Sequence, residues 1–157
     1  MTEQISTFFT TDMIYLWLNI GVIPFWFILI FFPDSKISGV FVRSIFPVFI
    51  LSATYVYLIY YFIISGYDFL INFNLYLGLD SLRELFNETG FLIIFWIHFL
   101  AINLFCGSWI VSDSRKLSIS KGIIFIPLLI TYFTGPLGIF IYWLIRIFFA
   151  KKISLYD

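Results

Sequence analysis

The stretch "WIHFLAINLFCGSW", residues 96–109, is the segment on which the fold class depends. It lies inside an apolar run long enough to cross a bilayer, yet it contains the chain's single histidine and single cysteine, together with Asn103. A polar group within hydrocarbon costs free energy unless another group of the protein satisfies it. We therefore predict that this segment is a membrane helix surrounded by other helices of the same protein.

The composition of the whole chain indicates an integral, multi-pass membrane protein. Of its 157 residues, 62% are hydrophobic and 11% are charged, whereas soluble domains are roughly 25% charged. The basic and acidic residues balance at nine each, which argues against nucleic acid as a partner. One cysteine and one histidine exclude an internal disulfide and multi-histidine metal sites, so we expect no metal and no cofactor.

The chain contains enough long apolar segments for four membrane crossings. A crossing needs about 20 mostly apolar residues, and lipid offers no partner to backbone groups outside a helix or a closed barrel. The expected fold is therefore an all-α bundle of four transmembrane helices, forming a single domain over residues 1–157. The expected spans are about 13–32, 45–65, 90–111 and 122–149.

The linker 66–89 is expected to contain a short interfacial helix. Ser81 and Glu84 have the spacing of a capping box, which marks a helix start. Leu82 and Leu85 then lie on one face, as in a helix that rests on a membrane surface.

The linkers 33–44 and 112–121 are expected to lie on the same side of the membrane, because the chain crosses the membrane twice between them, at about 45–65 and 90–111. Both carry basic residues, and basic loops favour the cytoplasmic side. We therefore expect the two chain ends on the opposite side. The basic residues concerned are Lys36, Arg43, Arg115, Lys116 and Lys121.

Polar and aromatic residues recur at helical spacing within the expected spans. Asp12, Asn19 and Trp26 follow each other at intervals of seven residues, so they lie on nearly one stripe of the first span. In the third span, Trp96 and Asn103 fall on one side, with His98 on another. A helix with two polar sides is expected to be the central one of the bundle.

The last span contains two glycines, Gly135 and Gly138, flanking a proline, which predicts a kink or a close helix contact at mid-membrane. Tyr142 and Arg146 continue the same face. Asn19, Asn103 and the glycines have a purely structural alternative, as interhelical hydrogen-bond partners and close-packing positions. His98 is the one titratable side chain well inside a span, and such groups usually serve function.

Three blocks together resemble the abscisic-acid-deficient-four-like membrane proteins: "LWLNIGVIPFWFILIFFP" (16–33), "WIHFLAINLFCGSWIVSD" (96–113) and "TGPLGIFIYWLIR" (134–146). The plant member of that family is required for making neoxanthin from violaxanthin, and its bacterial relatives were long grouped as a domain of unknown function. The resemblance covers nearly the whole chain. Two positions depart from the family pattern, because Asn103 stands where an Asp is usual and Ser108 where an Arg or similar residue is common.

The resemblance implies a cofactor-free isomerisation of a carotenoid or other isoprenoid. Such a reaction needs a proton donated to an epoxide oxygen and a proton removed from the adjacent polyene carbon. His98 is the candidate acid, and Asp12 or Asp113 would act as base or orient the imidazole. The candidate substrate-binding residues are Asn19, Trp26, Trp96, Asn103, Tyr142 and Arg146.

A second class of function uses the same residues without catalysis. The chain would then be a membrane pigment-binding or lipid-binding protein, or an accessory subunit of a larger complex. In either case the expected partners are membrane lipid and a carotenoid or other isoprenoid, and the expected location is a bacterial inner membrane.

Overall fold

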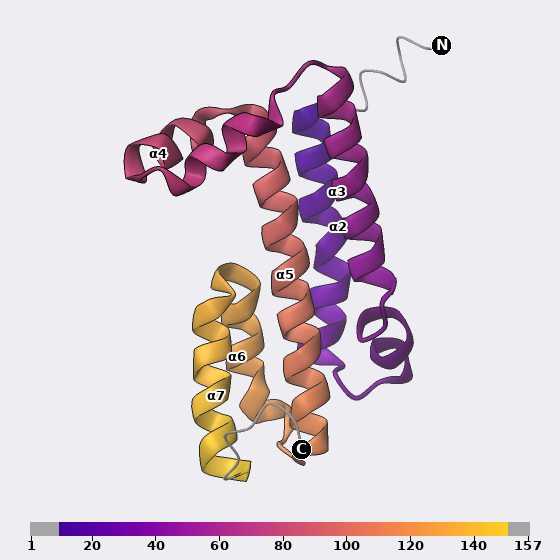
Figure 1. Ribbon diagram of the computed structural model, residues 1–157. Helices are drawn as coiled ribbons and strands as arrows, with labels where there is room; N and C mark the ends of the chain where they lie inside the picture. The colour runs from indigo at the N-terminus through magenta and orange to yellow at the C-terminus, as the bar shows by residue number, and fades with distance from the viewer. Residues whose placement is uncertain (1–9, 151–157) are drawn as a thin grey trace, which may run out of the picture. The chain divides into compact units, whose positions relative to one another are not determined.

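The computed structural model describes residues 10–150, and every regular element in this part of the chain is helical (Figure 1). The expected all-α class is therefore confirmed. The ends of the expected domain, residues 1–9 and 151–157, lie outside the described residues. In chain order the elements are α2 (Thr11–Phe31), η2 (Ser38–Val42), α3 (Phe46–Ile64), η3 (Phe69–Tyr76), α4 (Leu79–Asn87), α5 (Thr89–Lys116), α6 (Lys121–Thr134) and α7 (Pro136–Ala150).

Three segments of the described chain are long and apolar enough to cross a membrane: Thr11–Phe31, Ser38–Ile64 and Thr89–Lys116. The expected count of four crossings is not confirmed, because residues 122–149 form two helices instead of one. These helices, α6 and α7, contain 14 and 15 residues. At 1.5 Å per residue each is about 21–23 Å long, shorter than the ~30 Å hydrocarbon core of a bilayer.

The break between α6 and α7 follows from the sequence at Gly135 and Pro136. Gly135 caps α6 with a positive φ of 57°, a conformation that favours glycine. Pro136 is then the first residue of α7, where its missing N–H and fixed φ are tolerated. The two helices fold back on each other as an antiparallel hairpin (Figure 1). A Cβ atom at Gly138 would overlap Thr131 of α6, so the expected close helix contact is confirmed.

The chain divides into two compact units. The first contains Met1–Gly21 and Phe49–Leu100, and the second contains Val22–Val48 and Ala101–Asp157. The first unit includes the expected linker helix, since η3 and α4 lie between α3 and α5. The expected capping box is wrong, because α4 begins at Leu79 after Gly78, without a side-chain cap, and Ser81 lies inside it. The helix buries Leu85 and exposes Asp80 and Arg83.

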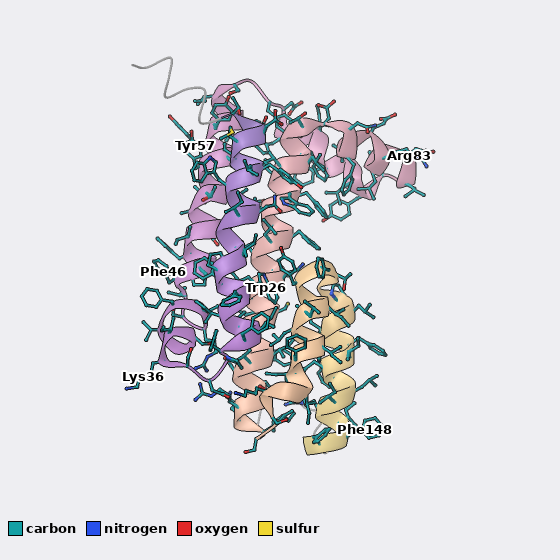
Figure 2. All side chains as sticks on the ribbon, turned by 180° about the vertical axis from the view of Figure 1, so that it is seen from behind. Trp26, Lys36, Phe46, Tyr57, Arg83 and Phe148 are labelled. Carbon is teal, nitrogen blue, oxygen red and sulfur yellow. The ribbon has the colours of Figure 1, made fainter. Side chains whose placement is uncertain are left out.

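Large apolar side chains are exposed along the helices, among them Phe46, Tyr57 and Phe148 (Figure 2). Exposure of such apolar side chains to lipid is favourable, whereas their exposure to water is unfavourable. The most apolar window of α5 is 50% buried, compared with 28% for α2 and 22% for the Ser38–Ile64 segment. The third expected span is thus the most enclosed of these helices, as the opening stretch predicted.

Candidate functional site

A polar and aromatic cluster joins the beginnings of α2 and α5 in the first unit. The indole Nε1 of Trp96 donates a hydrogen bond to Asn19 Oδ1 over 3.3 Å. The amide of Asn19 in turn donates to the backbone carbonyl of Tyr15 over 2.7 Å. The rings of Tyr15 and Trp96 are also in contact, with centroids 5.7 Å apart. Two of the expected substrate-binding residues, Asn19 and Trp96, are therefore brought together.

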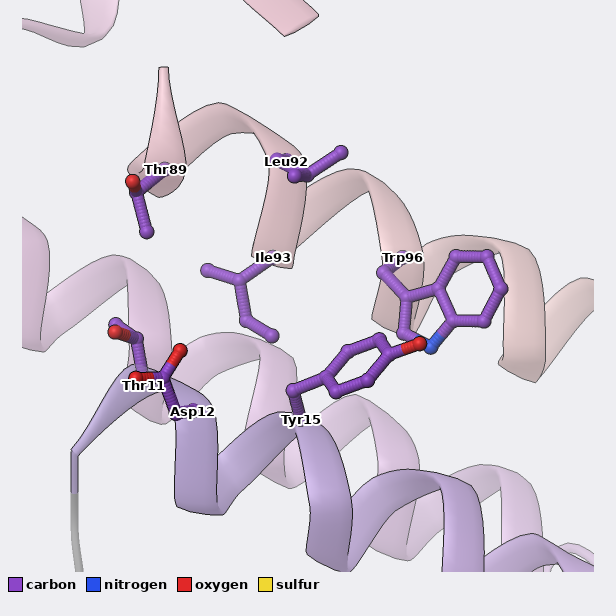
Figure 3. A pocket seen from close by; sticks show the side chains of 7 residues that line it. All are labelled: Thr11, Asp12, Tyr15, Thr89, Leu92, Ile93 and Trp96. Atoms are coloured by element: carbon purple, nitrogen blue, oxygen red, sulfur yellow. The ribbon is translucent and has the colours of Figure 1, made fainter. Parts of the chain in front are cut away.

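A pocket of about 340 Å³ adjoins this cluster (Figure 3). Among the residues that line it, Asp12 is the one with a charged side chain, and Trp96 and Tyr15 supply aromatic walls. Its other lining residues are Thr11, Thr89, Leu92 and Ile93. The pocket thus combines a mostly apolar surface with one carboxylate, the usual composition of a small-molecule site.

The helices explain why these side chains meet. Thr89, Leu92, Ile93 and Trp96 follow the spacing i, i+3, i+4 and i+7, which places them on one face of α5. Asp12 lies in the first turn of α2, where the backbone N–H groups favour a negative charge. The carboxylate can accept a proton or a hydrogen bond, and the Tyr15 hydroxyl can donate one.

A second polar cluster lies in the second unit, where α7 packs against α5. The Tyr142 hydroxyl donates to Asp113 Oδ2 over 2.6 Å, and Arg146 Nε donates to the same oxygen over 2.8 Å. Tyr142 is fully buried, and the side chains of Arg146 and Asp113 are 2% and 8% exposed. The Arg146 guanidinium also lies over the Trp143 ring, 5.5 Å from its centroid.

This second cluster is closed. Both carboxylate oxygens of Asp113 face Arg146, and the Tyr142 hydroxyl occupies one of them. Asp113 could not accept a proton from a substrate without losing its ion pair. The arrangement therefore suits a contact that holds α7 on α5 better than it suits a catalytic base.

Trp26 and Asn103 occupy close-packing positions in the same unit. Trp26 is 3% exposed, and a Cβ atom added to Gly107 would lie 2.7 Å from its ring. Asn103 packs against Gly135 at the turn of the hairpin, and its Nδ2 has no hydrogen-bond partner among residues 10–150. Both residues face inward as expected, but they lie in a different unit from the Asp12 pocket.

His98 is placed differently from the sequence-based expectation. Its side chain is exposed, and it is not among the residues that line the Asp12 pocket. Of the three expected catalytic residues, then, Asp12 lines an open pocket, Asp113 is held in an ion pair and His98 faces outward.

Several residues that line the pocket are not among the candidate site residues predicted from the sequence. Thr89, Leu92 and Ile93 lie on the same face of α5 as Trp96, so their helical spacing relative to Trp96 could have identified them as pocket residues. Tyr15 is one turn before Asn19, on the same side of α2.

The three apolar helices and the family assignment together indicate a helical membrane protein. The sequence profile of the ABA DEFICIENT 4-like family matches residues 13–142, and the chain belongs to this family. No curated protein and no solved structure gives a significant match.

Proposed function

We propose that this protein binds a carotenoid or related isoprenoid of a bacterial inner membrane and isomerises it, with the oxygenated end of the ligand in the Asp12 pocket. The observation that carries the proposal is the composition of that pocket: aromatic and aliphatic walls with one carboxylate, between the first turns of two membrane-length helices. The family resemblance supplies the substrate class.

The size of the pocket suits one end of such a molecule. A volume of about 340 Å³ is near the lower limit of the roughly 300–1,000 Å³ typical of ligand sites. It would enclose an oxygenated ring but not a whole carotenoid, so the polyene would continue along apolar side chains into the lipid. A ligand with a polar end and a long apolar tail fits these two surroundings.

The proposed reaction converts an epoxide next to a polyene into an allenic alcohol. One C–O bond of the epoxide breaks, its oxygen gains a proton, and the adjacent polyene carbon loses a proton, so the atoms balance without oxidation or reduction. In the pocket the Asp12 carboxylate would take the proton from carbon, and a water molecule would give a proton to the oxygen. Release of the proton from Asp12, which is exposed, to solvent restores the starting state.

The test compares Asp12→Asn with the wild type in a host that accumulates epoxy-carotenoids, with pigments followed by chromatography. We expect the wild type to convert a pigment, and Asp12→Asn to retain pigment during purification while its turnover falls about 100-fold or more. Asp80→Asn is the matched control, because Asp80 is an exposed carboxylate on α4 outside the pocket. Equal turnover by Asp12→Asn and the wild type would exclude Asp12 as the base.

A non-enzymatic pigment or lipid binder is the second candidate, and one observation favours it. Asp12 is the only carboxylate among the lining residues, and His98 does not line the pocket. Co-purification of unchanged pigment with the wild type, reduced in Trp96→Leu, would support binding without catalysis. His98→Gln is expected to keep full turnover; a loss of turnover with retained pigment would instead return His98 to the acid–base role.

A further inference from the structure

The linker between α2 and α3, in the second unit, contains a buried guanidinium nitrogen without a hydrogen-bond partner. Arg43 Nε is inaccessible to solvent and has no such partner among residues 10–150. Ser38, five residues earlier, is fully buried, and its Oγ is also unpartnered in this part of the chain. A desolvated charged donor left unpaired is unfavourable. Arg43 as a whole is half-buried, so a ligand could approach its terminal nitrogens, but not Nε, from outside.

The surroundings of Arg43 carry an excess of positive charge. Arg43 interacts electrostatically with Arg115, at the end of α5, and with Asp34. Arg115 Nε is 3.8 Å from Asp34 Oδ1, so the single carboxylate already faces one of the two guanidinium groups. Exposed lysines stand close in sequence to the two arginines: Lys36 in the linker that contains Arg43, and Lys116 and Lys121 shortly after Arg115.

Apolar side chains are exposed on the same linker. Ile37, Val40, Phe41 and Ile45 are between 50% and 79% exposed. The linker follows α2, and from Ser38 onward it forms the beginning of the second membrane-length segment, so in a bilayer it would lie near the boundary of lipid headgroups and acyl chains. Basic groups beside exposed apolar groups are the composition of a segment that rests in this interface.

We propose that Arg43 and Arg115 bind the phosphate of an anionic phospholipid headgroup. The terminal nitrogens of the Arg43 guanidinium would donate to the phosphate oxygens, and the inaccessible Nε would not take part. Arg115 would contribute the second cation. Inorganic phosphate shares this chemistry, but the exposed Ile37, Val40 and Phe41 favour a ligand with acyl chains.

The test uses the purified full-length protein in nanodiscs of phosphatidylcholine mixed with phosphatidylglycerol, with bound lipid measured by native mass spectrometry. We expect the wild type to retain phosphatidylglycerol preferentially. Arg43→Gln should lower that preference about fivefold, equivalent to about 1 kcal/mol, and Arg115→Gln provides a second variant should Arg43→Gln fail to fold. Arg83→Gln is the matched control, since Arg83 lies on α4 and pairs with exposed Asp80.

Two outcomes would overturn the proposal. One is an equal change of preference in Arg43→Gln and Arg83→Gln, which would show a non-specific charge effect. The other is the absence of any lipid preference together with binding of inorganic phosphate that requires Arg43, which would assign the site to a free anion. No pigment enters the measurement, so its result is independent of the proposed isomerase activity.

Discussion

The hydroxyl oxygen of Tyr142 on α7 lies 2.6 Å from Asp113 Oδ2 on α5, and Arg146 Nε lies 2.8 Å from the same oxygen. One carboxylate oxygen thus receives two donors separated by one turn of α7. Tyr142 is fully buried, and neither of the charged side chains is more than 8% exposed. A charge in such surroundings is tolerated only with its partner, so the three side chains should behave as one unit.

The first prediction is that removing the cation is far more costly than removing both charges. Arg146→Met should lower the free energy of unfolding by about 3–5 kcal/mol, because Asp113 is left charged and unpaired. The double variant Asp113→Asn with Arg146→Met should recover most of this loss. Reversible denaturation in mixed detergent micelles measures the difference.

The control for this prediction is the exposed pair on α4. Arg83 and Asp80 are 71% and 91% exposed, so Arg83→Met should change stability by less than about 0.5 kcal/mol. Equal stability of Arg146→Met and Arg83→Met would mean that the buried pair does not hold α7 on α5.

The second prediction concerns the contact of Gly107 with Trp26. A Cβ at position 107 would lie 2.7–2.8 Å from the indole ring and 3.3 Å from Leu29. Because the ring is 3% exposed and has little room to move, Gly107→Ala should destabilise the protein by about 1–3 kcal/mol. Gly21→Ala is the matched control: it too is helical, with nothing within 4 Å of its Cβ, and should be neutral or stabilising.

Helical spacing predicted the inward face of α2 but not the partners of its residues. Asn19 and Trp26 do face α5, where they meet Trp96 and Gly107 respectively. The spacing fixes a stripe on one helix, whereas the pairing also depends on how the second helix is rotated. That rotation is set by packing and cannot be read from one sequence.

The placement of His98 shows the same limit. On a helical projection His98 lies on the same side as Phe105, and both side chains are exposed in the structure. A polar residue within an apolar segment is therefore not enough to identify the inward side of a helix. The close contacts of this helix lie instead on the side of Asn103 and Gly107, where small and polar residues let neighbouring segments approach.

The division of residues 122–149 into two helices could have been predicted more sharply. Gly138, Tyr142 and Arg146 are buried, as expected for one face, and so is Thr131, but these residues belong to two helices. A glycine followed by a proline is the usual junction between the end of one helix and the start of the next. The high hydropathy of the whole segment had suggested a single crossing.

The third prediction is a pH dependence at Tyr67, in the linker between α3 and α5. Partial burial raises the pKa of Tyr67 above 10.0, and the carboxylates of Glu88 and Asp68 add to the effect. The Tyr67 hydroxyl donates to Asn72 over 2.7 Å, so Tyr67→Phe should cost about 1 kcal/mol at neutral pH.

The stability difference between the wild type and Tyr67→Phe should be constant below the unfolded pKa of about 10. It should shrink as the pH rises through the folded pKa, because the unfolded chain loses its proton first. Unfolding curves of both proteins between neutral pH and about pH 11 measure this. A difference that grows with pH would contradict the raised pKa of Tyr67.

The last prediction is that α6 and α7 enter the membrane from one side and return to it. Each helix is too short to cross, and the left-handed Gly135 joins them in an antiparallel hairpin. Single cysteines replacing Lys121 and Phe149, in a Cys106→Ser background, should therefore react with a membrane-impermeant maleimide from the same side of oriented vesicles. A cysteine replacing Arg83, before the α5 crossing, should react from the opposite side. Labelling of positions 121 and 149 from opposite sides would instead establish a fourth full crossing, with Gly135 as a kink within it.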